Sequence, residues 1–295
     1  MTRESFQKLT QSGLVFLDGA TGTNLMEAGL PKGVCSELWT LEHPDIILRL
    51  QRSYVEAGSQ ILYAPTFGAN AISLKKFGLE MEVVRLNTQL VHLCKEAAGS
   101  RALVAGDITT TGQPMAPWGE LEYDRLFQVY RQQILAQYQA GVDLIVAETL
   151  MGVAEAVVAL EAARSVCDLP VVCTLSLQTD GKAFFDGDGI EAVETLQALG
   201  VDAVGVNCSY GPDQLVSLIA NLHQVATIPI VAKPNAGLPV INERGIATYP
   251  MGPEVFAGHM QKLVDAGATI VGGCCGSNAR HIAALRRTLV RPKKS

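Results

Sequence analysis

The chain has 295 residues, of which 48% are hydrophobic and 18% are charged, and this composition is sufficient to bury a large core. A chain of this length can form one domain, because α/β barrels of about 250 residues fold as a single unit. A formal net charge of -6 argues against the basic face that nucleic-acid binding requires. No apolar stretch approaches the ~18 residues of a membrane helix, and the polar N-terminus lacks the apolar segment of a signal peptide, so we expect a cytoplasmic protein.

Eight short apolar runs, rich in Val, Ile and Leu, follow one another along the chain. They do not alternate strictly with polar residues, which is typical of parallel strands buried on both faces. The predicted strands are Val15–Asp18, Gln60–Phe67, Ala102–Ile108, Asp143–Thr149, Pro170–Leu177, Asp202–Ser209, Pro229–Pro234 and Thr269–Gly273.

Amphipathic segments separate these runs, and the clearest predicted helices are Asp45–Ala57, Leu121–Ala140 and Val255–Ala266. Four helix-to-strand junctions carry a glycine just past the helix, at the position where a left-handed residue commonly ends it: Gly58, Gly141, Gly200 and Gly267. Alternation of this kind indicates right-handed βαβ units. Eight such units without a linker or a change in composition predict a single (β/α)8 TIM barrel over residues 1–295, with an open doubly wound sheet as the alternative.

Three cysteines stand at the ends of predicted strands, where the active sites of such barrels lie. Cys208 ends the sixth strand, and Cys274 and Cys275 end the eighth. Three thiolates around one metal, with a fourth position left open, are typical of catalytic zinc. Two alternatives remain from the residues alone: the glycine-rich loop after the eighth strand could bind phosphate, or the adjacent cysteines could form a redox disulfide.

The other cysteines read as small buried hydrophobic residues, and they are Cys35, Cys94, Cys167 and Cys173.

Ionisable residues end four more strands. Asp18 precedes a glycine-rich turn that it could simply cap, whereas Glu148 closes a buried strand, where the cost of a carboxylate favours a role in ligand binding. Lys233 would allow Schiff-base chemistry, and hence a phosphate-binding lyase, as a rival reading. Asp107 is expected to anchor a turn or a loop.

Six segments at these strand ends together resemble the homocysteine S-methyltransferase family, over about residues 14 to 288. The segments are FLDGATGTNL, APTFGAN, VAETL, GVNCS, AKPNAGLP and VGGCCG. The stretches TFGANAISLKKFGLE and KPNAGLP look most like the homocysteine-binding module of cobalamin-dependent methionine synthase. Two departures stand out: Thr109-Thr110 replaces the usual Gly-Pro pair of those modules, and Gly68 replaces an aromatic residue of the betaine-dependent enzyme.

The resemblance implies a zinc ion on Cys208, Cys274 and Cys275 that activates the thiol of homocysteine for attack on a methyl group, giving methionine. It implies that Glu148 and the turn Asp18-Gly19-Ala20-Thr21 hold the amino-acid end of the substrate: carboxylates suit its ammonium group and backbone N–H groups suit its carboxylate.

Two asparagines complete the site that the resemblance implies. Asn207, beside Cys208, is expected to orient the substrate, and Asn235 is expected to be the fourth zinc ligand when homocysteine is absent.

The methyl donor is less constrained. Full methionine synthase carries folate and cobalamin domains for which this chain has no room, so we expect methylcobalamin presented by a separate corrinoid protein. The alternatives are that the chain is an excised module of a larger enzyme, that it uses S-methylmethionine or S-adenosylmethionine directly, and that it binds zinc or homocysteine without turnover.

Overall fold

Eight parallel strands form a ring in the computed structural model, which describes residues 1–241 and 247–290. Around the ring the order is β1-β10-β7-β6-β5-β4-β3-β2, and a parallel bridge between Leu17 and Ile61 joins β1 to β2. The strands are β1 (Val15–Phe16), β2 (Ile61–Tyr63), β3 (Leu103–Thr109), β4 (Leu144–Leu150), β5 (Val171–Leu175), β6 (Ala203–Asn207), β7 (Ile230–Lys233) and β10 (Ala268–Val271). This confirms the predicted (β/α)8 barrel, and the open sheet is wrong.

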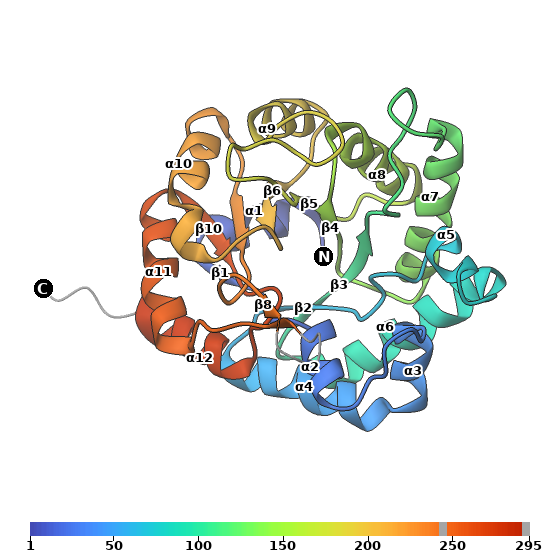
Figure 1. Cartoon of the computed structure of the whole chain (residues 1–295), viewed down its shortest axis with the longest axis horizontal. Coiled ribbons are helices and arrows are strands. Elements are labelled where there is room, and N and C mark those ends of the chain that lie inside the picture. Colours follow the sequence, from blue (N-terminus) through green and yellow to red (C-terminus); the bar gives the residue numbers. More distant parts are fainter. Residues whose placement is uncertain (242–246, 291–295) are drawn as a thin grey trace, which may run out of the picture.

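Helices surround the strands, as Figure 1 shows. They are α1 (Arg3–Gln11), α2 (Gly22–Glu27), α3 (Ser36–Glu42), α4 (Pro44–Ala57), α5 (Ala71–Lys75), α6 (Val83–Ala98), α7 (Tyr123–Gln139), α8 (Val153–Val166), α9 (Gly189–Ala198), α10 (Val216–Val225), α11 (Pro253–Asp265) and α12 (Ala279–Leu289), with short 3-10 turns at Glu80–Glu82 and Pro212–Gln214. Over the described ranges, none of these helices is both long and apolar enough to cross a membrane.

The helix boundaries follow local rules. Pro44 and Pro253 open α4 and α11, where a proline costs no hydrogen bond. The four junction glycines have φ angles of +101°, +85°, +83° and +119°, so the predicted left-handed helix ends are confirmed at Gly58, Gly141, Gly200 and Gly267.

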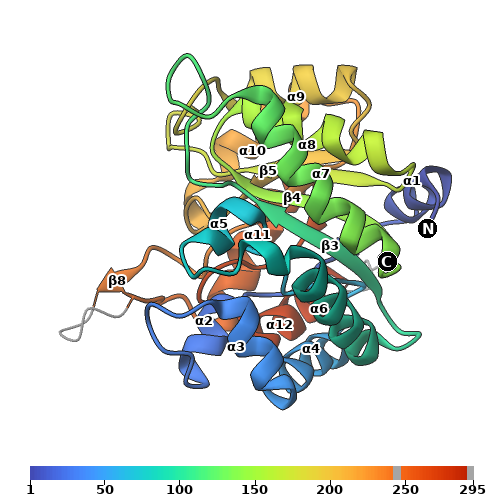
Figure 2. The same ribbon diagram turned by 90° about the vertical axis from the view of Figure 1, so that its right-hand side faces the viewer.

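The two ends of the barrel differ. At the N-terminal end of the strands, Phe6 of α1 packs into the same apolar cluster as Val15, Val231 and Ile270 of the barrel interior. At the opposite end, the short antiparallel pair β8 (Val240–Ile241) and β9 (Ala247–Thr248) projects from the body (Figure 2). Because α1 closes one end, the cavity of the barrel opens at the carboxyl ends of the strands.

Candidate active site

The topmost layer of side chains inside the barrel is polar. Side chains alternate between the two faces of a strand, so a residue two positions beyond an inward-facing apolar residue also faces inward. Ile61, Ala105, Val146 and Val231 belong to the inner apolar cluster. Two positions further along the same strands stand Tyr63, Asp107, Glu148 and Lys233.

These four residues line a cavity of about 430 Å³, together with Asp18 and the three cysteines of the predicted metal site. Asp107 therefore faces the cavity, and its expected role as a loop anchor is wrong: the backbone of Asp107, not its carboxyl, holds the neighbouring Thr66 hydroxyl.

The three cysteines converge at one side of this cavity. The sulfur atoms of Cys208, Cys274 and Cys275 all lie within 4.8 Å of one another, and those of Cys208 and Cys275 are 3.5 Å apart. In a tetrahedral zinc site with bonds of about 2.3 Å, neighbouring sulfurs stand about 3.8 Å apart. The thiols therefore have the spacing that a single metal ion requires.

A tight turn brings both adjacent cysteines to this side. The Ser277 N–H donates to the Cys274 carbonyl oxygen, and Gly276 between them has a φ of +79°, as the third residue of a type II turn requires. A β-carbon at Gly276 would lie 2.2 Å from that of Tyr249. Cys208 itself has a φ of +49°, a costly backbone conformation of the kind that gathers at functional sites.

The thiols also affect one another's ionisation. Hydrogen bonds from the thiols of Cys208 and Cys274, and a smaller one from the Tyr249 hydroxyl, lower the pKa of Cys275 to about 3. The pKa of Cys208 is raised, because it serves as a donor to its neighbours. Cys275 is thus the first thiolate of the group. Tyr249 follows the β8–β9 pair and had no signal in the sequence, since a lone aromatic residue in a loop has no distinctive pattern.

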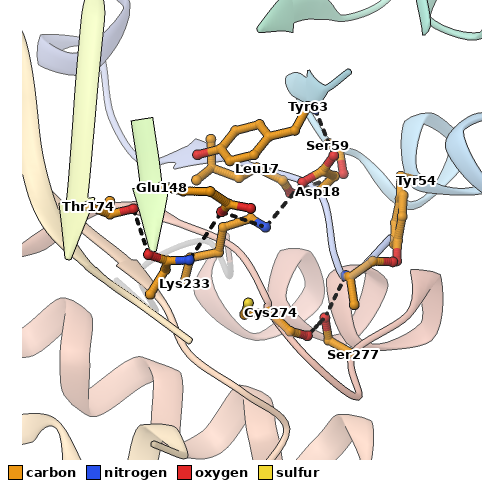
Figure 3. Close-up of polar contacts among 12 residues, drawn as sticks. Leu17, Asp18, Tyr54, Ser59, Tyr63, Glu148, Thr174, Lys233, Cys274 and Ser277 are labelled. Atoms are coloured by element: carbon orange, nitrogen blue, oxygen red, sulfur yellow. Dashed lines mark hydrogen bonds and ion pairs between the residues drawn. The ribbon is translucent and has the colours of Figure 1, made fainter. Parts of the chain in front are cut away.

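A buried charge cluster forms the other side of the cavity (Figure 3). Lys233 Nζ lies 3.6 Å from Asp18 Oδ1 and 3.6 Å from Glu148 Oε2, and 4.6 Å from the centre of the Tyr63 ring. Asp18 Oδ2 accepts a hydrogen bond of 2.8 Å from the Tyr63 N–H. Asp18 therefore binds the neighbouring strand and the lysine, which excludes the reading in which it merely caps its own turn.

Burial and charge act in opposite directions on these groups. Burial raises the pKa of Asp18 and of Glu148 to about 7, although Lys233 lowers both. Burial alone would lower the pKa of Lys233, but the two carboxylates raise it well above its usual value. Since Schiff-base chemistry needs a neutral amine, this environment argues against the lyase reading.

Asn207 lies beneath Glu148, outside the cavity lining. Its amide nitrogen donates to Glu148 Oε2 (3.2 Å) and to Thr149 Oγ1 (2.7 Å). Its amide oxygen accepts from the Thr149 N–H (2.7 Å) and the Thr174 hydroxyl (2.8 Å). The amide thereby holds Thr149 at a φ of +60° and fixes Glu148. Both residues line the cavity, so Asn207 supports the cavity wall from behind them.

The turn after β1 lines the cavity with Gly19, Ala20 and Thr21. The Ala20 N–H donates to Ser277 Oγ, and the Ala20 carbonyl accepts from the Tyr54 hydroxyl. In the described parts of the chain, the N–H groups of Gly19 and Thr21 have no acceptor. Two of the three amides predicted to bind a carboxylate therefore remain available.

Asn235 lies in the loop after β7, beside the cysteine turn. Its N–H donates to the Tyr210 carbonyl, and the next residue, Ala236, donates to the Cys275 carbonyl. Asn235 is 5% exposed, and its Oδ1 has no hydrogen-bond partner among the described residues. A buried acceptor without a partner is costly. Asn235 is not among the residues that line the cavity with the three cysteines, so its role as a metal ligand stays a prediction.

Comparison with known proteins places these residues in context. A model of the homocysteine S-methyltransferase family matches residues 15–289. The chain is 27% identical over 292 residues to a methionine synthase of Mycobacterium leprae and 29% identical over 298 residues to a methionine synthase of Mycobacterium tuberculosis. These matches cover 93% and 94% of the chain but 24% and 25% of the relatives, so the chain spans about a quarter of their length.

Solved structures share the fold. The oxidized form of the homocysteine methyltransferase MmuM from Escherichia coli matches with a TM-score of 0.78 at 22% identity, covering 93% of this chain and 95% of that one. Its metallated form matches with a TM-score of 0.77 at 22% identity, covering 95% and 97%.

Proposed function

Since the chain belongs to the homocysteine S-methyltransferase family and is a methyltransferase, we propose that it transfers a methyl group to the sulfur of homocysteine, giving methionine. One observation carries the proposal: three thiols with the spacing of a zinc site share a cavity with buried carboxyl groups and free backbone amides. This arrangement offers a place for each end of a thiol amino acid.

Cys208, Cys274 and Cys275 are the proposed zinc ligands. The unpartnered Oδ1 of Asn235 supports its assignment as the fourth ligand in the absence of substrate. Zinc in such a site supplies an exchangeable position in which a thiol is held as the reactive thiolate. The residues around it then have to hold the substrate and keep water away.

The rest of the cavity is proposed to hold the amino-acid end of homocysteine. Glu148 and Asp18 provide negative charge for its ammonium group, and the free amides of Gly19 and Thr21 suit its carboxylate. Lys233 keeps both carboxylates in place through its two ion pairs. Because Asp18, Glu148 and Lys233 are buried, each of these charge interactions is stronger than it would be in water.

For the methyl donor we favour methylcobalamin on a corrinoid protein. The support is the similarity of two segments, TFGANAISLKKFGLE and KPNAGLP, to the homocysteine-binding module of cobalamin-dependent methionine synthase. The donor has to reach the substrate sulfur through the open end of the cavity.

The test combines metal analysis with a panel of donors: a methylated corrinoid protein, S-methylmethionine and S-adenosylmethionine. Wild type and Cys274→Ala are compared, with Cys94→Ala as a control because Cys94 is a buried cysteine of α6. We expect one zinc per chain and methionine formation in wild type and the control, and loss of both in Cys274→Ala.

Other outcomes contradict particular parts of the proposal. Turnover with a free sulfonium compound and no corrinoid would refute the favoured donor. Binding of homocysteine without methionine from any donor would leave a binding protein in place of an enzyme, and full activity without metal would refute the zinc site.

A further inference from the structure

Tyr249 lies against the cysteine turn and lines the same cavity as the three thiols. A β-carbon at Gly276 would lie 2.2 Å from the Tyr249 β-carbon, so this close approach requires a glycine at position 276. The Tyr249 hydroxyl donates a hydrogen bond to the Cys275 sulfur. Apart from the cysteines themselves, no other residue in the described ranges donates to any of the three sulfurs.

Hydrogen bonds hold the backbone beside Tyr249 to the cysteine turn. Two residues further on, the Met251 N–H donates to the Ala236 carbonyl (3.1 Å), and the Ala236 N–H donates to the Cys275 carbonyl (2.9 Å). The Met251 carbonyl also accepts a hydrogen bond of 2.9 Å from His281 Nε2. The segment is therefore fixed relative to Cys275, the residue whose sulfur the tyrosine hydroxyl contacts.

The charge of the proposed zinc site gives this hydrogen bond a purpose. Three thiolates outweigh the two positive charges of zinc, and a homocysteine thiolate in the fourth position adds another negative charge. The carboxyl groups of Asp18 and Glu148 line the same cavity. A hydrogen bond to a thiolate withdraws charge from its sulfur, and hydrogen bonds to the ligands of a metal orient them and tune the metal.

We propose that Tyr249 is a positioning residue of the zinc site, whose hydroxyl donates to the Cys275 thiolate and limits the negative charge that this ligand gives to the metal. The inference rests on the proposed function for the identity of the metal and of the bound thiol. With less charge arriving from Cys275, the homocysteine sulfur is bound more strongly and loses its proton more readily. Tyr249 thus acts on the substrate through Cys275.

The test uses Tyr249→Phe, which keeps the ring and removes the hydroxyl. Zinc affinity is measured by competition with a chelator, homocysteine binding to the zinc-loaded protein by calorimetry, and the sulfur-to-metal charge-transfer band by absorption of the cobalt-substituted protein. We expect the Kd for zinc to rise about 10- to 100-fold, the range for a lost partner of a metal ligand, and the Kd for homocysteine to rise with it. The band should move to lower energy, because the Cys275 sulfur then holds its electrons less tightly. Tyr138→Phe, on the exposed side of α7, is the control.

The spectrum separates a hydrogen bond from a packing contact. Weaker zinc binding with the band at its wild-type energy would show that the ring only packs against the turn, and would overturn the inference, as would wild-type affinity and spectrum together. Tyr249→Leu, which also lacks the donor, should show the same shift, and it takes the place of Tyr249→Phe if that variant does not fold. Failure of the proposed function has a different signature: wild type then makes no methionine from any donor, while metal affinity and the spectrum still test Tyr249.

Discussion

Replacing Lys233 with methionine would test the buried charge cluster most directly. The lysine is 3% exposed and lies 3.6 Å from each of two carboxylates. Each pair is worth about 4–5 kcal/mol at an effective dielectric constant of ~20, and much of that is offset by desolvation. Removing one partner of a buried pair typically costs about 3–5 kcal/mol, which is the expected loss of unfolding free energy above neutral pH.

The loss should depend on pH in a defined direction. The folded-state pKa values of Asp18 and Glu148, about 7, lie above the usual 3.8 and 4.5, so the contribution of these two groups to wild-type stability falls as pH rises from about 4 to 7. Without Lys233 both pKa values rise further. Above pH 7 the folded variant then binds more protons than folded wild type, and its stability falls more steeply, by about 1.4 kcal/mol per pH unit for each carboxyl group.

Urea unfolding at pH 6 and pH 8.5 measures the loss of stability and its pH dependence. A chelator and a reductant are present so that metal binding does not contribute. The control is Lys8→Met, which removes a lysine from a surface pair with Glu4 and should cost less than about 1 kcal/mol. A Lys233→Met protein as stable as this control at pH 8.5, or equally destabilised at both pH values, would refute the reasoning.

Two further substitutions probe the support of the site. Asn207→Leu removes all four hydrogen bonds of the amide. Glu148 keeps its ion pair with Lys233 but loses a hydrogen bond, and the Thr149 N–H and the Thr174 hydroxyl lose their acceptor. We expect a loss of about 3 kcal/mol or more in urea unfolding, and wild-type stability would contradict this. Gly276→Ala should lower both the melting temperature and the zinc content, because the new β-carbon would clash with Tyr249. The control is Gly78→Ala, at a φ of +70° with no atom within 4 Å of the new β-carbon. This control should lose about 1–3 kcal/mol of stability and keep its zinc.

Sequence patterns predicted the strands well but could not say which way their side chains point. The strand that contains Glu148, β4, is buried on both faces, so its sequence does not show that Val146 and Glu148 face the barrel interior. For the same reason the sequence predicted a turn- or loop-anchoring role for Asp107 and no pairing of Lys233 with Asp18. To make these assignments, one must know which alternate residues of each strand point into the barrel.

Two kinds of information thus define this protein. The sequence alone determined the alternation of eight strands with helices, the positive-φ glycines at helix ends and the three thiols, because these depend on local periodicity, on backbone sterics and on the rule that parallel strands end at the same side. Only the tertiary structure decided that Lys233 forms ion pairs with both Asp18 and Glu148, that Asn207 supports Glu148 and Thr149, and that Asp107 faces the same cavity. Those relations join different strands across the ring, and their energies depend on burial and on distances of a few ångströms, which no local pattern records.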